Sequence, residues 1–416
     1  MSYETLRRFY YGTEEKYAAE YHMRFSSEEA VKLDFFIAGK QAFFLVNADV
    51  LRLSYEIAKV DKEVYQLSTK LPGVAKKQYS KKCLIDEIVL TNKIEGVHSS
   101  RKEIGEALAI LEQQSNERKK HPRFISLVNK YMKLMTGEVV PLQSCRDVRQ
   151  IYDEIFLEEV VSEEPRNAPD GELFRKEMSA VYSETDRIIH KGLTPEDKII
   201  KAMEQALYFL NDESVEKLYR ICLFHYLIEY IHPFYDGNGR LGRFILSYCI
   251  SETLEPLLAY RISETIKEHV REYYRAFTVC NDPRNLADLT PFLIMQLEMI
   301  CIAIGDLRDS LKRRLSSWNK YEQLTDSLPN ADSINMCRLY SYLIQAALFS
   351  ENGISTADLR TQFEASYNTV KNLLRQVPEE MLIVQKKGRS KYYQIDLNIL
   401  DEVLLEKQAD AQIKLF

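Results

Sequence analysis

Apolar residues recur at helical spacing along almost the whole chain, and the alternating apolar and polar runs typical of strands are rare before residue 380. Glycine, which weakens helices, is scarce at 14 residues. Within this pattern residues 41–60 and 81–96 are predicted helices, and a Pro-Gly pair at 72–73 separates them. The sequence therefore predicts a mainly α-helical protein.

The pattern changes along the chain and suggests three regions. Residues 1–140 form an N-terminal helical region, and residues 141–325 form a second block. This block contains the longest non-helical section, in which two short apolar pieces at 180–182 and 188–190 flank a polar turn and predict a small β-hairpin. A polar segment at 326–336 with a proline marks a boundary, so residues 331–416 are predicted as a separate domain.

Composition places the chain among globular proteins. It has 416 residues, 45% of them hydrophobic, and this is enough for two or three filled cores. The first residues are charged throughout, and we expect no 18-residue apolar window, so the sequence favours a cytoplasmic protein that does not cross a membrane. Seven scattered cysteines without a CxxC pair are typical of reduced core thiols. A net charge of −6 argues against attraction of the whole molecule to nucleic acid.

The stretch HPFYDGNGRLGR, residues 232–243, concentrates polar chemistry between two apolar runs. Its glycines 237, 239 and 242 have the GxGxxG spacing of dinucleotide-binding folds, but that fingerprint follows a strand. Here the preceding run has helical spacing, so the segment is predicted to join two helices. Pro233 ends the first helix, and Gly237 and Gly239 let the chain turn into a second helix that begins near Asn238 to Arg240.

This loop has the residue types that phosphate chemistry needs. Free N–H groups at the start of a helix attract an anion. Arg240 and Arg243, three residues apart, are expected to point to one side and to grip phosphate oxygens. Asp236 suits Mg²⁺, and His232 can accept a proton from a hydroxyl. Together they predict transfer of a phosphorus-containing group to a hydroxyl; the alternative is a plain helical corner with a capping histidine and solvated arginines.

The same twelve residues resemble the HPFx(D/E)GNGRxxR signature of the Fic-domain family of protein adenylyltransferases. Three other segments agree in order with this family: GELFR at 171–175, FLN at 209–211 and EYYRAFTVCN at 272–281. The resemblance covers roughly residues 145–300. It implies a helical Fic-type core with a β-hairpin flap over the site.

The resemblance also implies a reaction and its residues. AMP would pass from ATP to a Ser, Thr or Tyr hydroxyl of a protein, the chain itself included, with His232 as the base and Asp236 holding Mg²⁺. The flap residues Ile188, Ile189 and His190 would dock the target segment by strand addition. The nucleotide-binding residues would be Asp236, Gly237, Asn238, Gly239, Arg240, Gly242, Arg243, Tyr273, Tyr274 and Asn281. The tyrosine pair has a simpler interpretation, since adjacent aromatic residues on a helix are often core.

A predicted helix at about 82–96 carries a second motif. Thr91 and Glu95 are four residues apart and share one helix face, and with Gly96 they resemble the inhibitory (S/T)xxxE(G/N) helix of autoinhibited Fic proteins. By this resemblance Glu95 would pair with Arg243 and occupy the cation that the γ-phosphate needs. The alternative is an exposed glutamate in the last turn before a glycine cap.

The C-terminal region, 331–416, is different in kind. Three predicted helices are followed by two short strands around a basic tip, and this order resembles a winged helix-turn-helix domain. Residues 355–391 hold seven basic and four acidic residues, a small excess for duplex binding, so a DNA partner, a protein partner and a homodimer contact all stay open. The basic and recognition-helix candidates are Tyr367, Asn368, Lys371, Arg375, Lys386, Lys387, Arg389 and Lys391.

Three functions therefore compete. The first is an autoinhibited protein adenylyltransferase, and the second is a DNA-binding regulator in which the Fic-like part only senses nucleotide. The presence of His232 and Arg243 favours the first, because a sensor needs no base. The third is the removal of AMP from a modified protein, with Glu95 positioning the attacking water, and the sequence does not separate it from the first.

Overall fold

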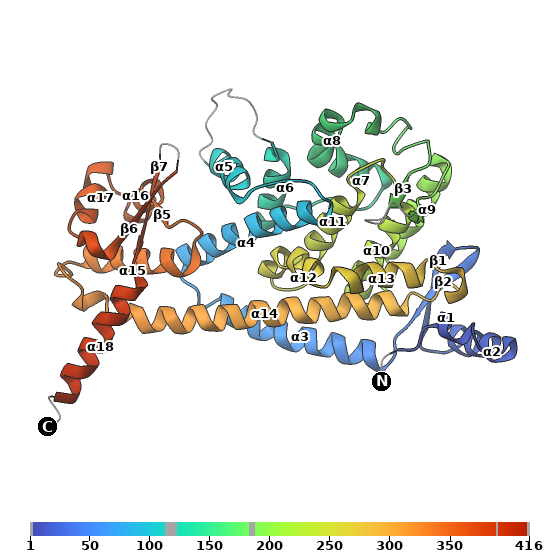
Figure 1. Cartoon of the computed structure of the whole chain (residues 1–416), viewed down its shortest axis with the longest axis horizontal. Helices are drawn as coiled ribbons and strands as arrows, with labels where there is room; N and C mark the ends of the chain where they lie inside the picture. The colour runs from blue at the N-terminus through green and yellow to red at the C-terminus, as the bar shows by residue number, and fades with distance from the viewer. Residues whose placement is uncertain (1–2, 113–122, 183–187, 388–389, 414–416) are drawn as a thin grey trace. The chain divides into compact units, whose positions relative to one another are not determined.

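The computed structural model describes residues 3–112, 123–182, 188–387 and 390–413. The predicted helical class is confirmed: helices dominate the described part of the chain, and its strands form three small sheets (Figure 1). The chain divides into two compact units, each built from two segments. The first unit combines Met1–Lys62 with Leu84–Leu307, and the second combines Glu63–Cys83 with Arg308–Phe416.

The first unit is centred on two consecutive helices, α10 (Lys217–Ile231) and α11 (Asn238–Ser251). Every residue of α11 except Gly239 is buried, as expected of a helix with neighbours on all sides. Three longer helices contribute part of their length to this unit: α3 (Ala48–Ser68), α4 (Gly73–Ile94) and α14 (Thr290–Glu322). The remaining helices of the unit are α1 (Leu6–Phe9), α2 (Glu14–Phe25), α5 (Arg101–Glu112), α6 (Ile125–Thr136), α7 (Cys145–Tyr152), α8 (Glu158–Glu163), α9 (Glu196–Leu210), α12 (Ile262–Glu268) and α13 (Val270–Cys280).

The glycine-rich loop lies between α10 and α11, so the glycines follow a helix and not a strand. The chain turns twice through the left-handed region, at His232 with φ 52° and at Gly237 with φ 82°. Glycine adopts this conformation without strain, whereas a histidine there must be held by its surroundings. The loop is therefore a fixed corner between two buried helices.

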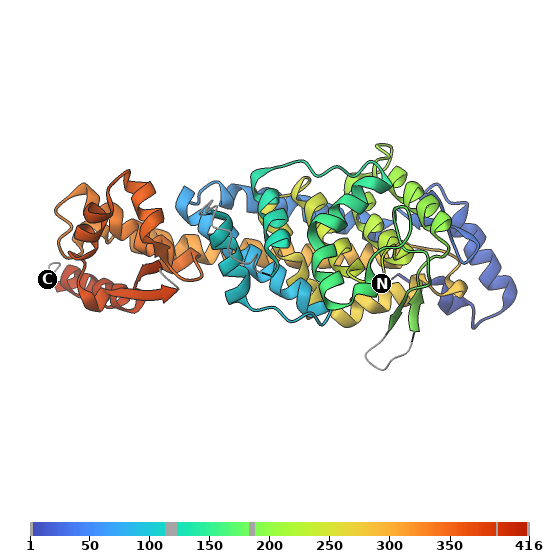
Figure 2. The same ribbon diagram turned by 90° about the horizontal axis from the view of Figure 1, so that it is seen from above.

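Two hairpins accompany the helices of this unit. The predicted hairpin is present as β3 (Ala180–Tyr182) and β4 (Ile188–Lys191), which pair antiparallel (Figure 2). A second hairpin, β1 (Ala30–Ile37) with β2 (Lys40–Leu45), corrects the helix predicted over 41–60, because α3 begins only at Ala48. Phe43 and Phe44 are fully buried there, and the backbone of Phe43 bonds to both Ala287 and Leu289, so tertiary pairing decides for a strand.

The expectation that no apolar window of 18 residues exists is also wrong. The segment Thr290–Ser327, which contains α14, is long and apolar enough to cross a membrane by length and composition. Most of that window, 61%, is buried inside the protein, as in the core helix of a globular unit. Length and composition alone are weak evidence for a membrane span when so much of the helix is covered by protein.

The second unit is a small helical domain with one sheet. Its elements are α15 (Ile334–Phe349), β5 (Ile354–Ser355), α16 (Thr356–Phe363), α17 (Tyr367–Leu374), β6 (Leu382–Lys387), β7 (Ser390–Ile395) and α18 (Leu397–Ile413). The strand order is β5-β7-β6, with both pairs antiparallel. Leu343, Leu359, Val370 and Ile395 are fully buried and form part of its core. Arg389 and the side chain of Lys387, two of the predicted basic contacts, lie outside the described residues.

Candidate active site

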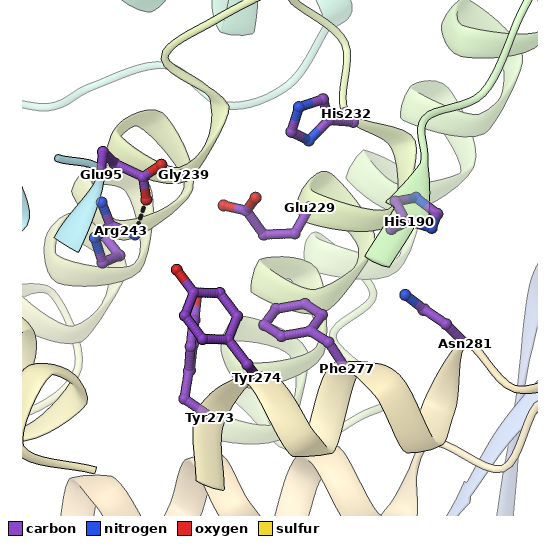
Figure 3. A pocket seen from close by; sticks show the side chains of 10 residues that line it. All are labelled: Glu95, His190, Glu229, His232, Gly239, Arg243, Tyr273, Tyr274, Phe277 and Asn281. Carbon is purple, nitrogen blue, oxygen red and sulfur yellow. Dashed lines mark hydrogen bonds and ion pairs between the residues drawn. The ribbon is translucent and has the colours of Figure 1, made fainter. Parts of the chain in front are cut away.

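A pocket in the first unit gathers most of the candidate residues (Figure 3). It holds about 550 Å³ of empty space, part of it open to solvent. Its walls come from α10, α11, α13, β4 and the residue that follows α4. The lining residues are Glu95, His190, Glu229, His232, Gly239, Arg243, Tyr273, Tyr274, Phe277 and Asn281.

Some of the predicted site residues do not line the pocket. Thr91 is one of them, and its hydroxyl oxygen accepts a hydrogen bond from Arg243. Five other candidates lie in the loop or on α11 without lining the pocket: Asp236, Gly237, Asn238, Arg240 and Gly242. The backbones of Ile188 and Ile189 are part of β4, but their side chains lie outside the described residues.

His232, the candidate base, caps the C-terminus of α10 and faces the pocket. Burial, together with the nearby His190 and Arg175, lowers its pKa to about 3, so the imidazole is neutral at physiological pH. Among the residues that the structure describes, none bonds to its buried Nδ1. The ring can therefore accept a proton, as a general base must.

The position of His232 is fixed by Arg175, the arginine of the GELFR segment. Its fully buried guanidinium donates from Nε to the His232 carbonyl at 2.9 Å and from Nη2 to the Leu193 carbonyl at 2.9 Å. Its third donor, Nη1, binds the Glu177 carbonyl. One side chain thus joins the loop, the segment before the hairpin and the segment after it. Gly192 leaves room for this arrangement, since a Cβ there would lie 2.3 Å from Arg175 Nη2.

Glu196, at the start of α9, holds the GELFR segment in turn. Its carboxylate accepts from three successive backbone N–H groups, those of Glu172, Leu173 and Phe174, at 2.8 to 3.0 Å. Burial opposes the charge, but these hydrogen bonds lower the pKa of Glu196 below its ordinary value. Sequence analysis missed this residue, because the three donors are 22 to 24 residues away along the chain.

Arg243 is held by the end of α4. Nη1 donates to Glu95 Oε1 at 2.8 Å, Nε to Thr91 Oγ1 at 2.9 Å and Nη2 to the Thr91 carbonyl at 3.0 Å. Burial alone would lower the pKa of Arg243, but Glu95, Tyr273 and Glu229 together outweigh it and the net shift is upward. The arginine side chain is 1% exposed and that of Glu95 is 32% exposed. The arginine is therefore fixed, whereas the glutamate can move towards solvent.

The contact between α4 and α11 follows a repeat of four residues on each helix. Glu87 and Thr91 share one face of α4, and Glu95, directly after the helix, continues that face. Gly239, Arg243 and Ser247 share one face of α11. Ser247 donates to Glu87 at 3.4 Å, and a Cβ on Gly239 would lie 2.3 Å from Glu95 Oε1. The bare backbone of Gly239 thus makes the room in which the carboxylate of Glu95 lies.

The loop residues have clear structural partners. The Asn238 side chain accepts the Phe234 N–H at 2.9 Å and donates to the Phe234 carbonyl at 2.8 Å, so this amide closes the loop. Tyr152 stacks on Phe234 at 3.6 Å between ring centroids and donates to the Asp236 carbonyl. Since the Asn238 side chain is used to close the loop, only its backbone is left to serve in the predicted anion hole.

Asp236 is the candidate magnesium ligand. One of its carboxylate oxygens accepts the Gly237 N–H at 2.5 Å, and in the described part of the chain no other side chain pairs with this half-buried carboxylate. No group of three or more His, Cys, Asp or Glu residues that could hold a metal alone is found among the described residues. Mg²⁺ commonly uses one or two carboxylates plus substrate phosphates, so a single carboxylate beside this loop fits that ion.

Arg240 and Arg243 do not converge on one point. Arg240 Nη1 donates to Glu159 Oε2 at 3.0 Å, and its guanidinium lies over the Phe156 ring at 5.2 Å. Its Nε and Nη2 are buried and have no partner among the described residues. The two arginines, expected to point to the same side, are instead held by different helices, α8 and α4.

The aromatic wall combines core and pocket roles. Tyr273 is 2% exposed, and its hydroxyl is 2.8 Å from His225 Nε2, so its hydrogen bond belongs to the core. Tyr274 is half-buried and stands at the pocket. Asn281 accepts from the Tyr226 hydroxyl at 2.6 Å through Oδ1, which leaves its amide nitrogen towards the pocket (Figure 3).

Glu229 is the pocket residue that sequence analysis missed. It lies on α10, three residues before His232, and its carboxyl points into the pocket (Figure 3). Burial and the nearby Glu95 raise its pKa to about 8, against the opposing effect of Arg243. An acidic residue inside the apolar run YRICLFHYLIEYI was the available signal.

The sequence matches one family profile and several known proteins. Residues 143–250 match the sequence profile of the Fic/DOC family. Protein adenylyltransferase fic-1 of Caenorhabditis elegans is 28% identical over 156 residues, 36% of this chain and 28% of that protein. Probable protein adenylyltransferase aq_aa38 of Aquifex aeolicus (strain VF5) is 37% identical over 62 residues, 15% of this chain and 19% of that protein. The chain thus aligns with less than a third of either relative.

Solved structures give matches of the same kind. A Fic family protein from Desulfovibrio desulfuricans G20 is 20% identical, with a TM-score of 0.48, over 84% of this chain and 97% of that one. A Fic-1 fragment from C. elegans is 20% identical, with a TM-score of 0.40, over 63% of this chain and 75% of that one.

The fold and the pocket define a helical protein with a glycine-rich loop between two central helices. The profile match assigns that loop, and the helices around it, to a known family. The chain contains a Fic domain, as the twelve-residue motif indicates.

Proposed function

We propose that the protein is an adenylyltransferase that moves AMP from ATP to a hydroxyl of a protein target, and that Glu95 holds it in an inhibited state. The observation that carries the proposal is the ion pair of Glu95 with the buried Arg243, at 2.8 Å, in the same pocket as the neutral His232. The names of the aligned relatives support the same chemistry.

In the proposed reaction the target oxygen forms a bond to the α-phosphorus of ATP. The bond between the α-phosphorus and the oxygen that bridges it to the β-phosphorus breaks, and pyrophosphate leaves. The hydroxyl proton passes to the imidazole of His232, a step that typically contributes about 10²- to 10⁴-fold in rate. Asp236 would hold Mg²⁺, which neutralises phosphate charge when it is bound.

Inhibition follows from competition for one cation. Each of the three guanidinium nitrogens of Arg243 donates to Thr91 or Glu95, so Glu95 competes with the γ-phosphate for this cation. The backbone of Gly239, at the start of α11, faces Glu95 as well. A glutamate in this position takes both the charge and the space of the terminal phosphate.

The test compares Glu95→Gly with the double variant Glu95→Gly/His232→Ala. Each protein is incubated with MgATP and a cell lysate, and the products are analysed by mass spectrometry. We expect AMP adducts, on the chain itself or on a target, with Glu95→Gly and none with the double variant, while both bind ATP. Absence of adducts in both proteins contradicts the transferase proposal, and equal adducts in both remove His232 as the base.

The second unit suggests an additional binding role. Its order of three helices with β5-β7-β6 supports a winged-helix interpretation, and Tyr367 at the start of α17 is 53% exposed. By that interpretation α17 would enter the major groove of a DNA duplex, or would contact a protein partner with the same surface. A gel shift over several salt concentrations separates them: no duplex binding at low salt leaves only the protein partner.

A further inference from the structure

The carboxyl of Glu229 lies inside the proposed nucleotide pocket. Its Oε1 is buried and has no hydrogen-bond partner among the described residues. The oxygen lies against the bare backbone of Gly242, where a Cβ would be 2.3 Å away. Figure 3 shows the group between His232 and the pair of Glu95 and Arg243. Packing thus holds an acidic side chain in the pocket, and no described residue forms a hydrogen bond with its buried oxygen.

The described groups around Glu229 offset a negative charge there only in part. Arg243 opposes the rise in the pKa of Glu229, but each of its three guanidinium nitrogens already donates to Thr91 or Glu95. From α10 itself, His225 and His232 are neutral, because burial lowers the pKa of each to about 3.

The other elements around the pocket add no cation to this carboxyl. Burial also lowers the pKa of His190 on β4, and burial raises that of Tyr273 on α13. Glu95 adds a negative charge, and Glu87 is bonded to Ser263 outside the pocket. A neutral carboxyl therefore suits this site better than a carboxylate.

We propose that Glu229 is a nucleotide-binding residue that acts as a neutral acid and donates a hydrogen bond to an oxygen of the phosphate chain. A carboxylate in this position would repel a triphosphate, whereas a protonated acid supplies the donor that phosphate oxygens require. When the terminal phosphate replaces Glu95 at Arg243, a negative charge again lies near Glu229, and this favours retention of the proton. The inference rests on the proposed function and adds a residue that the twelve-residue motif does not include.

The prediction concerns protons taken up on binding. Where Glu229 is partly ionised in the free protein, binding of an anionic nucleotide must draw in a proton, and one linked proton lowers the affinity about tenfold per pH unit above the pKa. The probe is α,β-methylene-ATP with Mg²⁺, because the link between its α- and β-phosphorus is not broken. Calorimetry at pH 6.5, 8 and 9 in buffers of different ionisation enthalpy gives both the affinity and the proton count.

Four proteins are compared. The first is Glu95→Gly alone, and the other three combine it with Glu229→Gln, with Glu229→Met or with Glu213→Gln. Glu213→Gln is the control, because this carboxyl is exposed and lies outside the pocket. We expect proton uptake at pH 8 with Glu95→Gly and with the control, and none beyond that of the ligand itself with Glu229→Gln. Glu229→Met, which is neutral but has no donor, should bind about two- to tenfold more weakly than Glu95→Gly at pH 6.5.

Equal proton uptake with and without Glu229→Gln overturns the inference, as does tight binding by Glu229→Met. If AMP transfer by Glu95→Gly is intact in that case, the proposed function stands and only the role of Glu229 is lost. If no variant binds the nucleotide at any pH, the proposed function and this inference both fall.

Discussion

Arg175 and His232 are joined through the backbone: Nε of the arginine donates to the histidine carbonyl at 2.9 Å. The contact links the GELFR segment to the twelve-residue motif, 57 positions further along the chain. Two more carbonyls, those of Glu177 and Leu193, accept from the same guanidinium. The left-handed conformation of His232 is thus supported by a residue outside the motif.

Replacing Arg175 should damage both the stability and the activity of the Fic domain. Arg175→Met keeps most of the apolar stem but leaves three part-buried carbonyls without this donor, so we expect a loss of about 2 to 4 kcal/mol in the free energy of unfolding. Chemical denaturation measures the loss, and labelling of Glu95→Gly/Arg175→Met by ATP measures the activity. A variant with unchanged stability would show that the three hydrogen bonds have little net effect.

Gly192 and Gly305 form a matched pair for glycine-to-alanine substitution. At Gly192 a Cβ would meet Arg175 Nη2 at 2.3 Å and the His232 Cβ at 2.9 Å, whereas at Gly305 on α14 nothing lies within 4 Å. In the Glu95→Gly protein, Gly192→Ala should reduce AMP labelling because it displaces Arg175 and His232, the proposed base. Gly305→Ala should stabilise the helix by about 1 kcal/mol and leave labelling intact. Equal labelling by both would mean that the segment around Gly192 adapts freely.

Thr91 should restrain Arg243 together with Glu95, but less strongly. Thr91→Val has nearly the same shape and removes the oxygen that accepts from Arg243 Nε at 2.9 Å, while the bond to Glu95 remains. We expect self-labelling to rise several-fold above that of the parent protein, since one hydrogen bond contributes about 1 kcal/mol, and to stay below that of Glu95→Gly. Labelling no higher than in the parent would limit the inhibitory contact to Glu95.

The buried Glu87 should make stability depend on pH. Burial raises its pKa to about 7 from 4.5, although hydrogen bonds from Ser263 act in the opposite direction. The unfolded chain releases this proton near pH 4.5 and the folded chain only near 7. The contribution is therefore fully present below pH 4.5 and is lost as the pH rises to 7, at a cost of about 3 kcal/mol.

Urea denaturation at pH 5 and pH 8 tests this prediction with Glu87→Gln. The fall in the free energy of unfolding between the two values should be smaller in the variant. The fall that remains includes the share of Glu229, whose pKa is raised in the same direction. An identical fall in both proteins would mean that Glu87 does not titrate in this range.

Local signals in the sequence predict the central part of the site. Helical spacing before Pro233 and the glycines after it define α10, the loop and α11. The spacing of four residues also places Thr91, on α4, and Glu95, directly after its end, on the same side. What the sequence did not reveal depends on contacts between distant segments. Glu196 finds its three donors, and Arg240 finds Glu159, only after the helices have packed.

Strand β2 and Glu229 show two other limits of sequence analysis. The apolar run at 43–45 fits a helix and a strand equally well, and the backbone of residues 287–289 decides between them. Glu229 lies outside the motif, in a run where an acid is expected to be a surface residue, and only the fold places it in the pocket. Periodicity assigns faces to helices but does not say which faces meet.

The missing side chain of Gly239 limits which substitutions can relieve the proposed inhibition. Its missing side chain leaves a space the size of a single methyl group, and Glu95 Oε1 would lie 2.3 Å from a carbon placed there. Under the proposed inhibition, an alanine at that position would displace the carboxylate of Glu95 and would also take up space that the terminal phosphate needs, so activity would not rise. Substitutions that relieve the proposed inhibition are therefore expected at Thr91 or Glu95, and not at Gly239.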